Sequence, residues 1–205
     1  MRKIVTTTFI TMDGVMQAPG GPTEDTSGGF KYGGWAVNYW DDMMGKVMDG
    51  FMSIPFELLL GKRTYDIFAS FWPYTKEDLA VAEPFNATKK YVVSDQSFEP
   101  SWHNSICITG DVVTQLKRLK EDEGPDLWVH GSGNLIQTLL KHHLIDRMHL
   151  WIFPVTVGNG RRLFAEGTQA EGFKLVESKS STTGVIIATY EPAGELKTGS
   201  FQLPE

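Results

Sequence analysis

Hydrophobic and polar residues along the chain follow two periodicities, which predict strands alternating with helices. Short runs rich in β-branched and aromatic residues, closed by Gly, Asp or Ser, are typical of strands. These runs predict strands at residues 4–10, 57–60, 91–93, 106–108, 127–129, 147–157, 173–178 and 185–190.

Apolar residues three to four positions apart predict amphipathic helices between several of these strands. One helix is expected over residues 43–52, with Asp41 or Asp42 as its N-cap. Thr64 and Asp111 are expected to cap two further helices, because a Ser, Thr, Asp or Asn side chain commonly closes a helix start. A fourth helix is expected directly after the glycines that follow the strand at 127–129.

The order of these elements predicts the fold class. Strands alternate with helices through the first two thirds of the chain, and strands alone follow, with a hairpin turn at Thr183 and Gly184. This order favours an α/β protein with a mixed sheet and helices on its faces. We expect one domain over residues 1–192 and a polar tail over residues 193–205.

Composition and charge narrow the possible functions. The chain has 205 residues, with 19 Lys and Arg against 25 Asp and Glu, so its formal net charge is −6. Nucleic-acid backbones require a basic face, so this balance argues against such a partner. Cys107 is the only cysteine, which excludes an internal disulfide and a cysteine-based zinc site.

Membrane and metal binding are not expected either. The first residues contain no apolar signal-peptide core, and no apolar run approaches the length of a membrane span. The histidines have no carboxylates at metal-ligand spacing, so we expect no metal. We expect a cytoplasmic protein.

Two glycine-containing strand ends are candidates for binding phosphate. Val129–Leu135 passes from a strand through Gly131 and Gly133 into a helix, which would bring backbone N–H groups and a helix N-terminus against an anion. A tight structural turn would explain the same pattern. Gly61–Thr64 repeats it with Lys62 and Arg63 in the first helical turn, where cations oppose the helix dipole unless an anion is bound; two solvated charges are the alternative.

A long loop and the helix start after it are candidates for binding substrate. Residues 17–34 are rich in Gly, Pro, Ser and Thr, and loops of this length are commonly functional. Trp35 and Trp40 provide flat stacking surfaces close to Asp41 and Asp42. A carboxylate among aromatic rings can bind a heterocycle edge or hold a proton; a helix cap beside core tryptophans is the alternative.

Together these motifs resemble the dihydrofolate-reductase-like superfamily, specifically the reductase domain of riboflavin biosynthesis and its stand-alone relatives. The resemblance covers the chain to about Pro192 and rests on motifs in matching order. These are residues 11–14, 59–65, 92–94, 129–135, 144–150, 154–155 and 158–164.

The resemblance implies a mainly parallel sheet of eight or nine strands and an NADPH cofactor across the strand ends. It implies a mobile loop shaped by Asp13 and Gly14, and phosphate contacts from Lys62, Arg63 and Thr64. The full set of implied cofactor contacts is Asp13, Gly14, Gly61, Lys62, Arg63, Thr64, Val93, Ser94, Gly131, Ser132, Gly133, Asn134 and Leu135. The family also tends to form homodimers through its C-terminal strands.

The resemblance predicts an NADPH-dependent reductase of a small heterocyclic, ribosylaminopyrimidine or pterin-like substrate. Trp35, Trp40 and His130 are the expected substrate contacts, and Asp41, Asp42 or a water is the expected proton source. Riboflavin reductases typically have Glu where this chain has His130, so a non-catalytic NADP(H)-binding or nucleotide-binding protein is the alternative. A true dihydrofolate reductase is a further alternative. The lone Cys107 excludes the zinc deaminase domain that accompanies some relatives.

Overall fold

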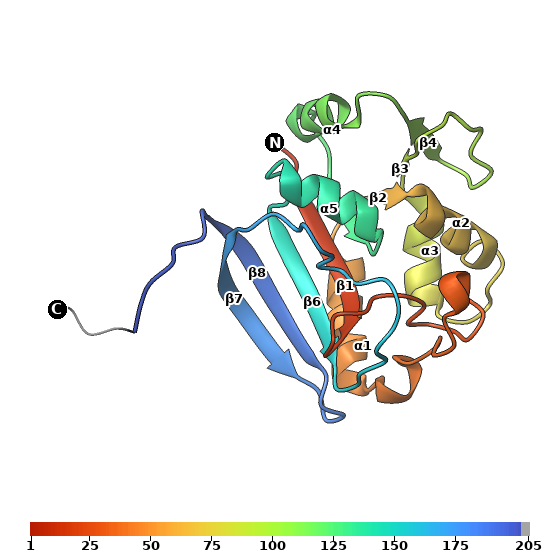
Figure 1. The fold of residues 1–205 in the computed structure, drawn as a ribbon. Coiled ribbons are helices and arrows are strands. Elements are labelled where there is room, and N and C mark those ends of the chain that lie inside the picture. The colour runs from red at the N-terminus through yellow and green to blue at the C-terminus, as the bar shows by residue number, and fades with distance from the viewer. Residues whose placement is uncertain (202–205) are drawn as a thin grey trace.

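Eight strands form one sheet in the order β4-β3-β2-β5-β1-β6-β8-β7 (Figure 1). The computed structural model describes residues 1–201. The strands are β1 Ile4–Thr11, β2 Phe56–Gly61, β3 Lys90–Val93, β4 Ser105–Ile108, β5 Asp126–His130, β6 Arg147–Phe153, β7 Gly172–Ser180 and β8 Ile186–Gly194.

Strands β1 to β6 run parallel, and the C-terminal end of the sheet is antiparallel. β1 lies between β5 and β6 and is parallel to both, whereas β8 pairs antiparallel with β6 and β7 antiparallel with β8. Nearly every residue of β1 is buried, as expected for a central parallel strand covered on both faces. The predicted fold class, a mainly parallel mixed sheet with an antiparallel C-terminal end, is confirmed.

Five α-helices cover the two faces of the sheet. They are α1 Asp42–Met52, α2 Lys62–Phe71, α3 Leu79–Ala87, α4 Val112–Glu121 and α5 Gly133–Lys141. Leucines of α4 and α5 pack with one face of β1, β2, β5 and β6. Side chains of α1, α2 and α3 pack with the opposite face. The helix after β2, which is α2, therefore lies on the opposite face of the sheet from α5, the helix after β5.

The helix caps follow the prediction at two of three places. The Asp41 carboxylate accepts a hydrogen bond from the Met44 N–H at 2.9 Å, and Asp111 does the same for Thr114 at 3.1 Å. The prediction that Thr64 caps α2 is wrong, because the helix already begins at Lys62 with Gly61 as its N-cap residue.

Two strand ends and one helix also differ from the prediction. β6 ends at Phe153, not at residue 157, because Pro154 has no N–H to continue the ladder. Helix α3 was not predicted; its apolar residues surround the whole helix, so they show no helical stripe, and the sequence contains Pro84. β8 continues to Gly194, two residues past the expected domain boundary at 192. Residues 202–205 of the expected tail lie outside the described residues.

Candidate functional site

Neighbouring strands β2 and β5 end at the same edge of the sheet, and their helices leave toward opposite faces. β2 pairs in parallel with β5 and passes at Gly61 into α2, while β5 ends at His130 and passes through a short turn into α5. In open α/β sheets, ligands bind outside the carboxyl ends of strands at such a point. The region between the starts of α2 and α5, at the ends of β2 and β5, is therefore the candidate site.

Ser132 joins the two helix starts directly. Its hydroxyl oxygen accepts a hydrogen bond from the Gly61 N–H at 2.8 Å, and the hydroxyl donates to Thr64 Oγ1 at 2.7 Å. A Cβ added at Gly61 would lie 3.2 Å from the Ser132 side chain, so glycine permits this approach. Val93 lies beside Gly61 in the β2–β3 register. Two motifs that are about 70 residues apart thus form one structure.

The starts of α2 and α5 differ from those of α1 and α4. Asp41 and Asp111 cap α1 and α4 with side-chain hydrogen bonds, whereas neither α2 nor α5 receives a side-chain cap. The first N–H groups of a helix lack intrahelical acceptors and carry partial positive charge. Two uncapped helix starts joined in this way are suited to an anion such as a phosphate.

The glycine turn before α5 has little space around it. Gly131 has φ +70° and Ser132 has φ 68°, so two successive residues adopt the left-handed conformation. A Cβ on Gly133 would lie 3.0 Å from the sulfur of Met16. Asn134 is exposed in the first turn of α5, while Leu135 is buried. Met16 therefore packs against the turn, and a residue larger than glycine at 133 would displace it.

Two cations of α2 have anionic partners within the chain. The Lys62 ammonium contacts the Asp66 carboxylate at 2.6 Å and lies 4.5 Å from the Phe98 ring centre. Arg63 Nη1 donates to the Ser27 hydroxyl at 2.8 Å and lies 3.3 Å from the Asp25 carboxylate. Arg63 is nevertheless exposed, so its guanidinium faces the solvent at the start of α2.

Asp13 ties the loop after β1 to the loop after β6. Its carboxylate accepts hydrogen bonds from the Thr11 hydroxyl at 2.5 Å, the Gly158 N–H at 2.8 Å and the Val157 N–H at 3.3 Å. These bonds, the Thr11 hydroxyl first, lower the pKa of Asp13. Gly14 has φ +80°, and its carbonyl accepts from the Leu163 N–H at 3.0 Å. The two loops run together past the start of α5 (Figure 1).

Ser94 lies beyond the end of β3, at the same edge of the sheet. Its N–H donates to the Ile108 carbonyl at 3.0 Å, and its hydroxyl accepts from the Gln96 N–H at 3.4 Å. This hydroxyl stays partly accessible, next to the strand end where Val93 meets Gly61.

The predicted substrate tryptophans lie in different environments. Trp40 is 44% exposed and stacks on Trp151, with ring centres 5.9 Å apart and an interplanar angle of 5°. Trp35 is half-buried, and its indole N–H donates to the Gln17 carbonyl at 2.8 Å. The exposed part of the Trp40 ring can therefore contact a ligand, while Trp35 mainly anchors the long loop.

His130 faces an aromatic cluster on the side of the sheet covered by α1, α2 and α3. Its ring centre lies 4.9 Å from Phe85, 6.1 Å from Trp128 and 6.4 Å from Phe68. Its Nε2 is enclosed and has no hydrogen-bond partner among the described residues. Burial, with the nearby His149 ring, lowers the pKa of His130 to about 3. His130 is thus a neutral imidazole.

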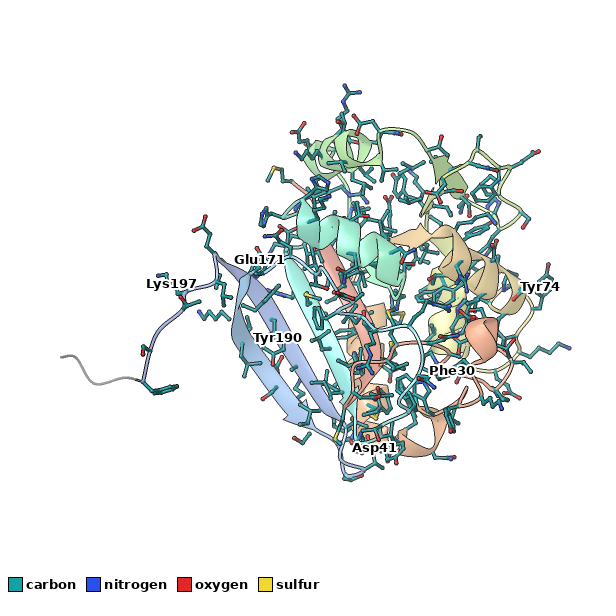
Figure 2. The ribbon with its side chains drawn as sticks, in the orientation of Figure 1. Phe30, Asp41, Tyr74, Glu171, Tyr190 and Lys197 are labelled. Atoms are coloured by element: carbon teal, nitrogen blue, oxygen red, sulfur yellow. The ribbon has the colours of Figure 1, made fainter. Side chains whose placement is uncertain are left out.

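Asp41 and Asp42 have different surroundings. Beyond capping α1, the Asp41 carboxylate accepts from the Thr182 N–H at 2.8 Å and the Thr182 hydroxyl at 2.7 Å. These bonds, the Met44 N–H first, lower its pKa. Figure 2 shows Asp41 at the end of the sheet, near the β7–β8 turn. Asp42 is exposed, and its carboxylate has no hydrogen-bond partner within residues 1–201.

Several residues of this region were not predicted from the sequence. Met16 packs over the glycine turn, Gln17 is buried beneath the long loop, and Asp25 and Arg161 form an ion pair across it. Arg161 belonged to the motif at residues 158–164, and Gln17 and Asp25 belonged to the loop at residues 17–34, but no individual role was expected for them. Only tertiary contacts give these residues a role.

Residues 1–201 contain neither a cluster of metal ligands nor a membrane-spanning helix. No group of three or more His, Cys, Asp or Glu side chains there could hold a metal ion. None of the helices in this part of the chain is long and apolar enough to cross a bilayer.

Two known proteins of Bacillus subtilis are similar to this chain, one over nearly its full length and one over part of it. The uncharacterised protein YyaP of Bacillus subtilis (strain 168) is 26% identical over 192 residues, covering 92% of this chain and 94% of YyaP. A second B. subtilis protein, the uncharacterised YwjB, is 32% identical over 62 residues, covering 30% of this chain and 36% of YwjB.

Solved structures show the same fold at low identity. A protein assigned to riboflavin biosynthesis from Shewanella sp. PV-4 has a TM-score of 0.68 at 22% identity, covering 93% of this chain and 98% of its own. A pyrimidine reductase-like protein of Corynebacterium diphtheriae has 0.61 at 13%, covering 95% and 93%. Dihydrofolate reductase of Enterococcus faecalis, complexed with NADP(H), has 0.58 at 12%, covering 93% and 96%.

The family assignment rests on a match that spans most of the domain. The model of the RibD C-terminal domain matches residues 2–187, from the start of the sheet into β8. The motifs at the ends of β1, β2, β3 and β5 all fall inside this range. The chain belongs to the RibD C-terminal domain family, and it has the dihydrofolate-reductase-like fold.

Proposed function

We propose that the protein is an NADPH-dependent reductase of a small heterocyclic substrate of the ribosylaminopyrimidine or pterin type. One observation carries the proposal: two helix starts without side-chain caps are joined by Ser132, and Arg63 lies in the first turn of α2. Family membership supports a reductase-like role.

The residues at the starts of α2 and α5 fit the chemistry of a dinucleotide cofactor. Backbone N–H groups at the starts of α2 and α5 suit the pyrophosphate, and the glycines at 131 and 133 allow its close approach. Arg63 suits a further phosphate on the adenosine ribose because its guanidinium can donate two parallel hydrogen bonds. Val93 and Ser94 then flank the adenosine. Bound NADPH supplies the hydride, and the protein supplies position and electrostatics.

For the substrate, we propose contacts with Trp40 and His130, and Trp35 supporting the loop. An enclosed neutral imidazole nitrogen without a partner is costly, and a heterocycle N–H or hydroxyl group would satisfy it. Such contact requires the aromatic rings around His130 to move, because the nitrogen is enclosed.

We propose Asp42 or a water molecule, rather than Asp41, as the proton source. Hydrogen bonds to its charged form lower the pKa of Asp41, which makes it a poor proton donor near neutral pH. Asp42→Asn should lower kcat if Asp42 donates the proton and leave kcat unchanged if water does. Asp41→Asn serves as comparison; it should lower the midpoint of thermal unfolding, since the α1 cap and the Thr182 contacts both weaken.

Two measurements test the proposed reductase. Titration with NADPH and NADH should show saturable binding with a preference for NADPH. Oxidation of NADPH should then accelerate with one member of a panel of pterins and ribosylaminopyrimidines. A protein that binds NADPH but turns over no member of the panel would instead support the alternative, a non-catalytic NADP(H)-binding protein, which His130 in place of the expected Glu favours.

We also propose a homodimer formed through the C-terminal strands. β7 is the edge strand of the sheet, and residues 174–180 are all exposed. Leu175 is 50% exposed and Val176 48%, on opposite sides of the strand, and Ile186 on β8 is 43% exposed. An exposed edge strand with apolar residues on both sides is suited to pairing with a second chain.

A further inference from the structure

Two arginines from distant parts of the chain meet at one carboxylate of the long loop. Arg63 lies at the start of α2, and Arg161 lies in the loop after β6. Both guanidinium groups contact Asp25, and both also donate to the Ser27 hydroxyl, Arg63 at 2.8 Å and Arg161 at 2.6 Å. The two cations would otherwise face each other without an anion between them.

Asp25 is the least exposed member of this group. Its side chain is 9% exposed, while those of Arg161 and Arg63 are 42% and 60% exposed. The carboxylate thus lies beneath the two guanidinium groups, in the position that an anionic ligand of these arginines would take. Its contacts are unequal: Arg161 holds it closely, whereas Arg63 Nη1 lies 3.3 and 3.4 Å from its two oxygens.

Gln17 sets the loop in this position. Its buried amide donates to the backbone carbonyls of Asp25 at 3.0 Å and Ser27 at 2.9 Å, and its oxygen accepts from the Arg161 N–H at 3.0 Å. The loop carboxylate and the Arg161 backbone are therefore held against each other. The short helix Ser27–Gly29 of this loop lies close to α2 (Figure 1), and Ser27 contacts Arg63 there.

We propose that Asp25 is an internal competitor for the phosphate-binding arginine, and that the loop must release Arg63 before a phosphate group binds there. This inference rests on the proposed function, which assigns Arg63 to a cofactor phosphate. A phosphate beside Arg63 would be close to the Asp25 carboxylate, and like charges at short range repel. The long Arg63 contact breaks first, and the loop stays attached through Arg161. Asp25 thereby disfavours phosphate-bearing ligands until the loop moves.

The test compares Asp25→Asn with Glu24→Gln. Glu24 lies on the same loop, and its carboxylate accepts from the Gly20 N–H at 2.7 Å, a bond that glutamine can keep. Both variants remove one negative charge, but only Asp25→Asn changes the group between the arginines. The probe is adenosine 2′,5′-bisphosphate, which carries the ribose phosphate without a nicotinamide, and adenosine 5′-monophosphate is the matched ligand without the 2′-phosphate.

Asp25→Asn is expected to bind the bisphosphate on the order of fivefold more tightly than the wild type, since exposed charge pairs have small energies. Binding of the monophosphate should change less, and Glu24→Gln should match the wild type. Hydrogen exchange of the ligand-free Asp25→Asn variant should increase at residues 17–34 while the sheet remains protected.

Three outcomes overturn the proposal. They are unchanged or weaker bisphosphate binding by Asp25→Asn, an equal gain in Glu24→Gln, and unchanged exchange of the loop. A fourth outcome would be that neither the wild type nor Asp25→Asn binds the bisphosphate. The arginine pair would then be no phosphate site, and the proposal would be wrong. If the bisphosphate binds as expected but NADPH is never oxidised with any substrate, the proposed reductase fails while the role of Asp25 stands.

Discussion

Arg63 is the residue on which selectivity for a phosphorylated cofactor is expected to depend. Arg63→Ala should weaken NADPH binding by about 1–3 kcal/mol, the value of a hydrogen bond to a charged group, and weaken NADH binding much less. Calorimetric titration of both cofactors checks this. Lys62→Ala is a useful comparison, because Lys62 lies only 2.6 Å from its partner Asp66, whereas Arg63 lies 3.3 Å from Asp25. Equal losses for both cofactors in Arg63→Ala would contradict a contact with the 2′-phosphate.

His130 and His149 should make stability depend on pH in a defined window. Burial is the main cause that lowers the pKa of His130 to about 3 and that of His149 to about 4, against 6.5 for an ordinary histidine. The unfolded chain therefore binds more protons, so stability is full above pH 6.5 and falls as the pH drops toward 4. Each histidine contributes a slope approaching about 1.4 kcal/mol per pH unit.

Urea unfolding at pH 7, 6 and 5 measures this slope. The double variant His130→Gln with His149→Gln should be less stable at pH 7 but should lose much less stability between pH 6 and 5. The low-pKa carboxylates Asp13 and Asp41 lose their contribution only below their ordinary value of 3.8, so they do not act in this window. An unchanged slope in the double variant would show that other groups cause the dependence.

At the scale of elements, the start of α5 is the part of the site most sensitive to added bulk. Gly131→Val should abolish cofactor binding while the fold survives, because its side chain would cover the backbone that approaches the pyrophosphate. A β-branched residue in the left-handed backbone conformation also costs about 1–2 kcal/mol of stability. Fluorescence titration with NADPH and thermal unfolding measure the two effects separately.

Gly194→Val is the matched control for this glycine. Gly194 has φ +88°, in the same left-handed region as the +70° of Gly131, and nothing lies within 4 Å of an added Cβ. It ends β8, which β1 and β6 separate from β2 and β5, so the variant should lose similar stability and keep normal binding. Normal NADPH binding by Gly131→Val would show that the pyrophosphate does not lie there.

At the scale of the whole molecule, the C-terminal edge of the sheet predicts the oligomeric state. Sedimentation should show a dimer of the 22.9 kDa chain. Replacing both Leu175 and Val176 by Glu should give a folded monomer, because the charges would enter the paired edge. Ile54→Glu is the control, since Ile54 is 53% exposed away from β7. A wild-type monomer, or a dimer that survives both replacements, contradicts the proposed interface.

Local sequence patterns predicted most of the elements and the resemblance to the family. β-branched runs bounded by glycine and aspartate identified the strands, because a strand depends on its own residues and their alternation. The aspartate that caps α4 was equally local. Thr64 was misassigned because its hydroxyl bonds to Ser132, which is distant in sequence, and α3 was missed because its apolar residues form no single stripe.

Tertiary structure alone decided how these elements make a site. The parallel strands β2 and β5 become neighbours only in the folded sheet. The contact between Gly61 and Ser132 therefore cannot be predicted from either motif alone. Likewise, Asp25 is an ordinary loop residue in the sequence, and only packing places its carboxylate between Arg63 and Arg161. Local patterns specify secondary structure, whereas charge pairing over 38 and 136 residues depends on the folded topology.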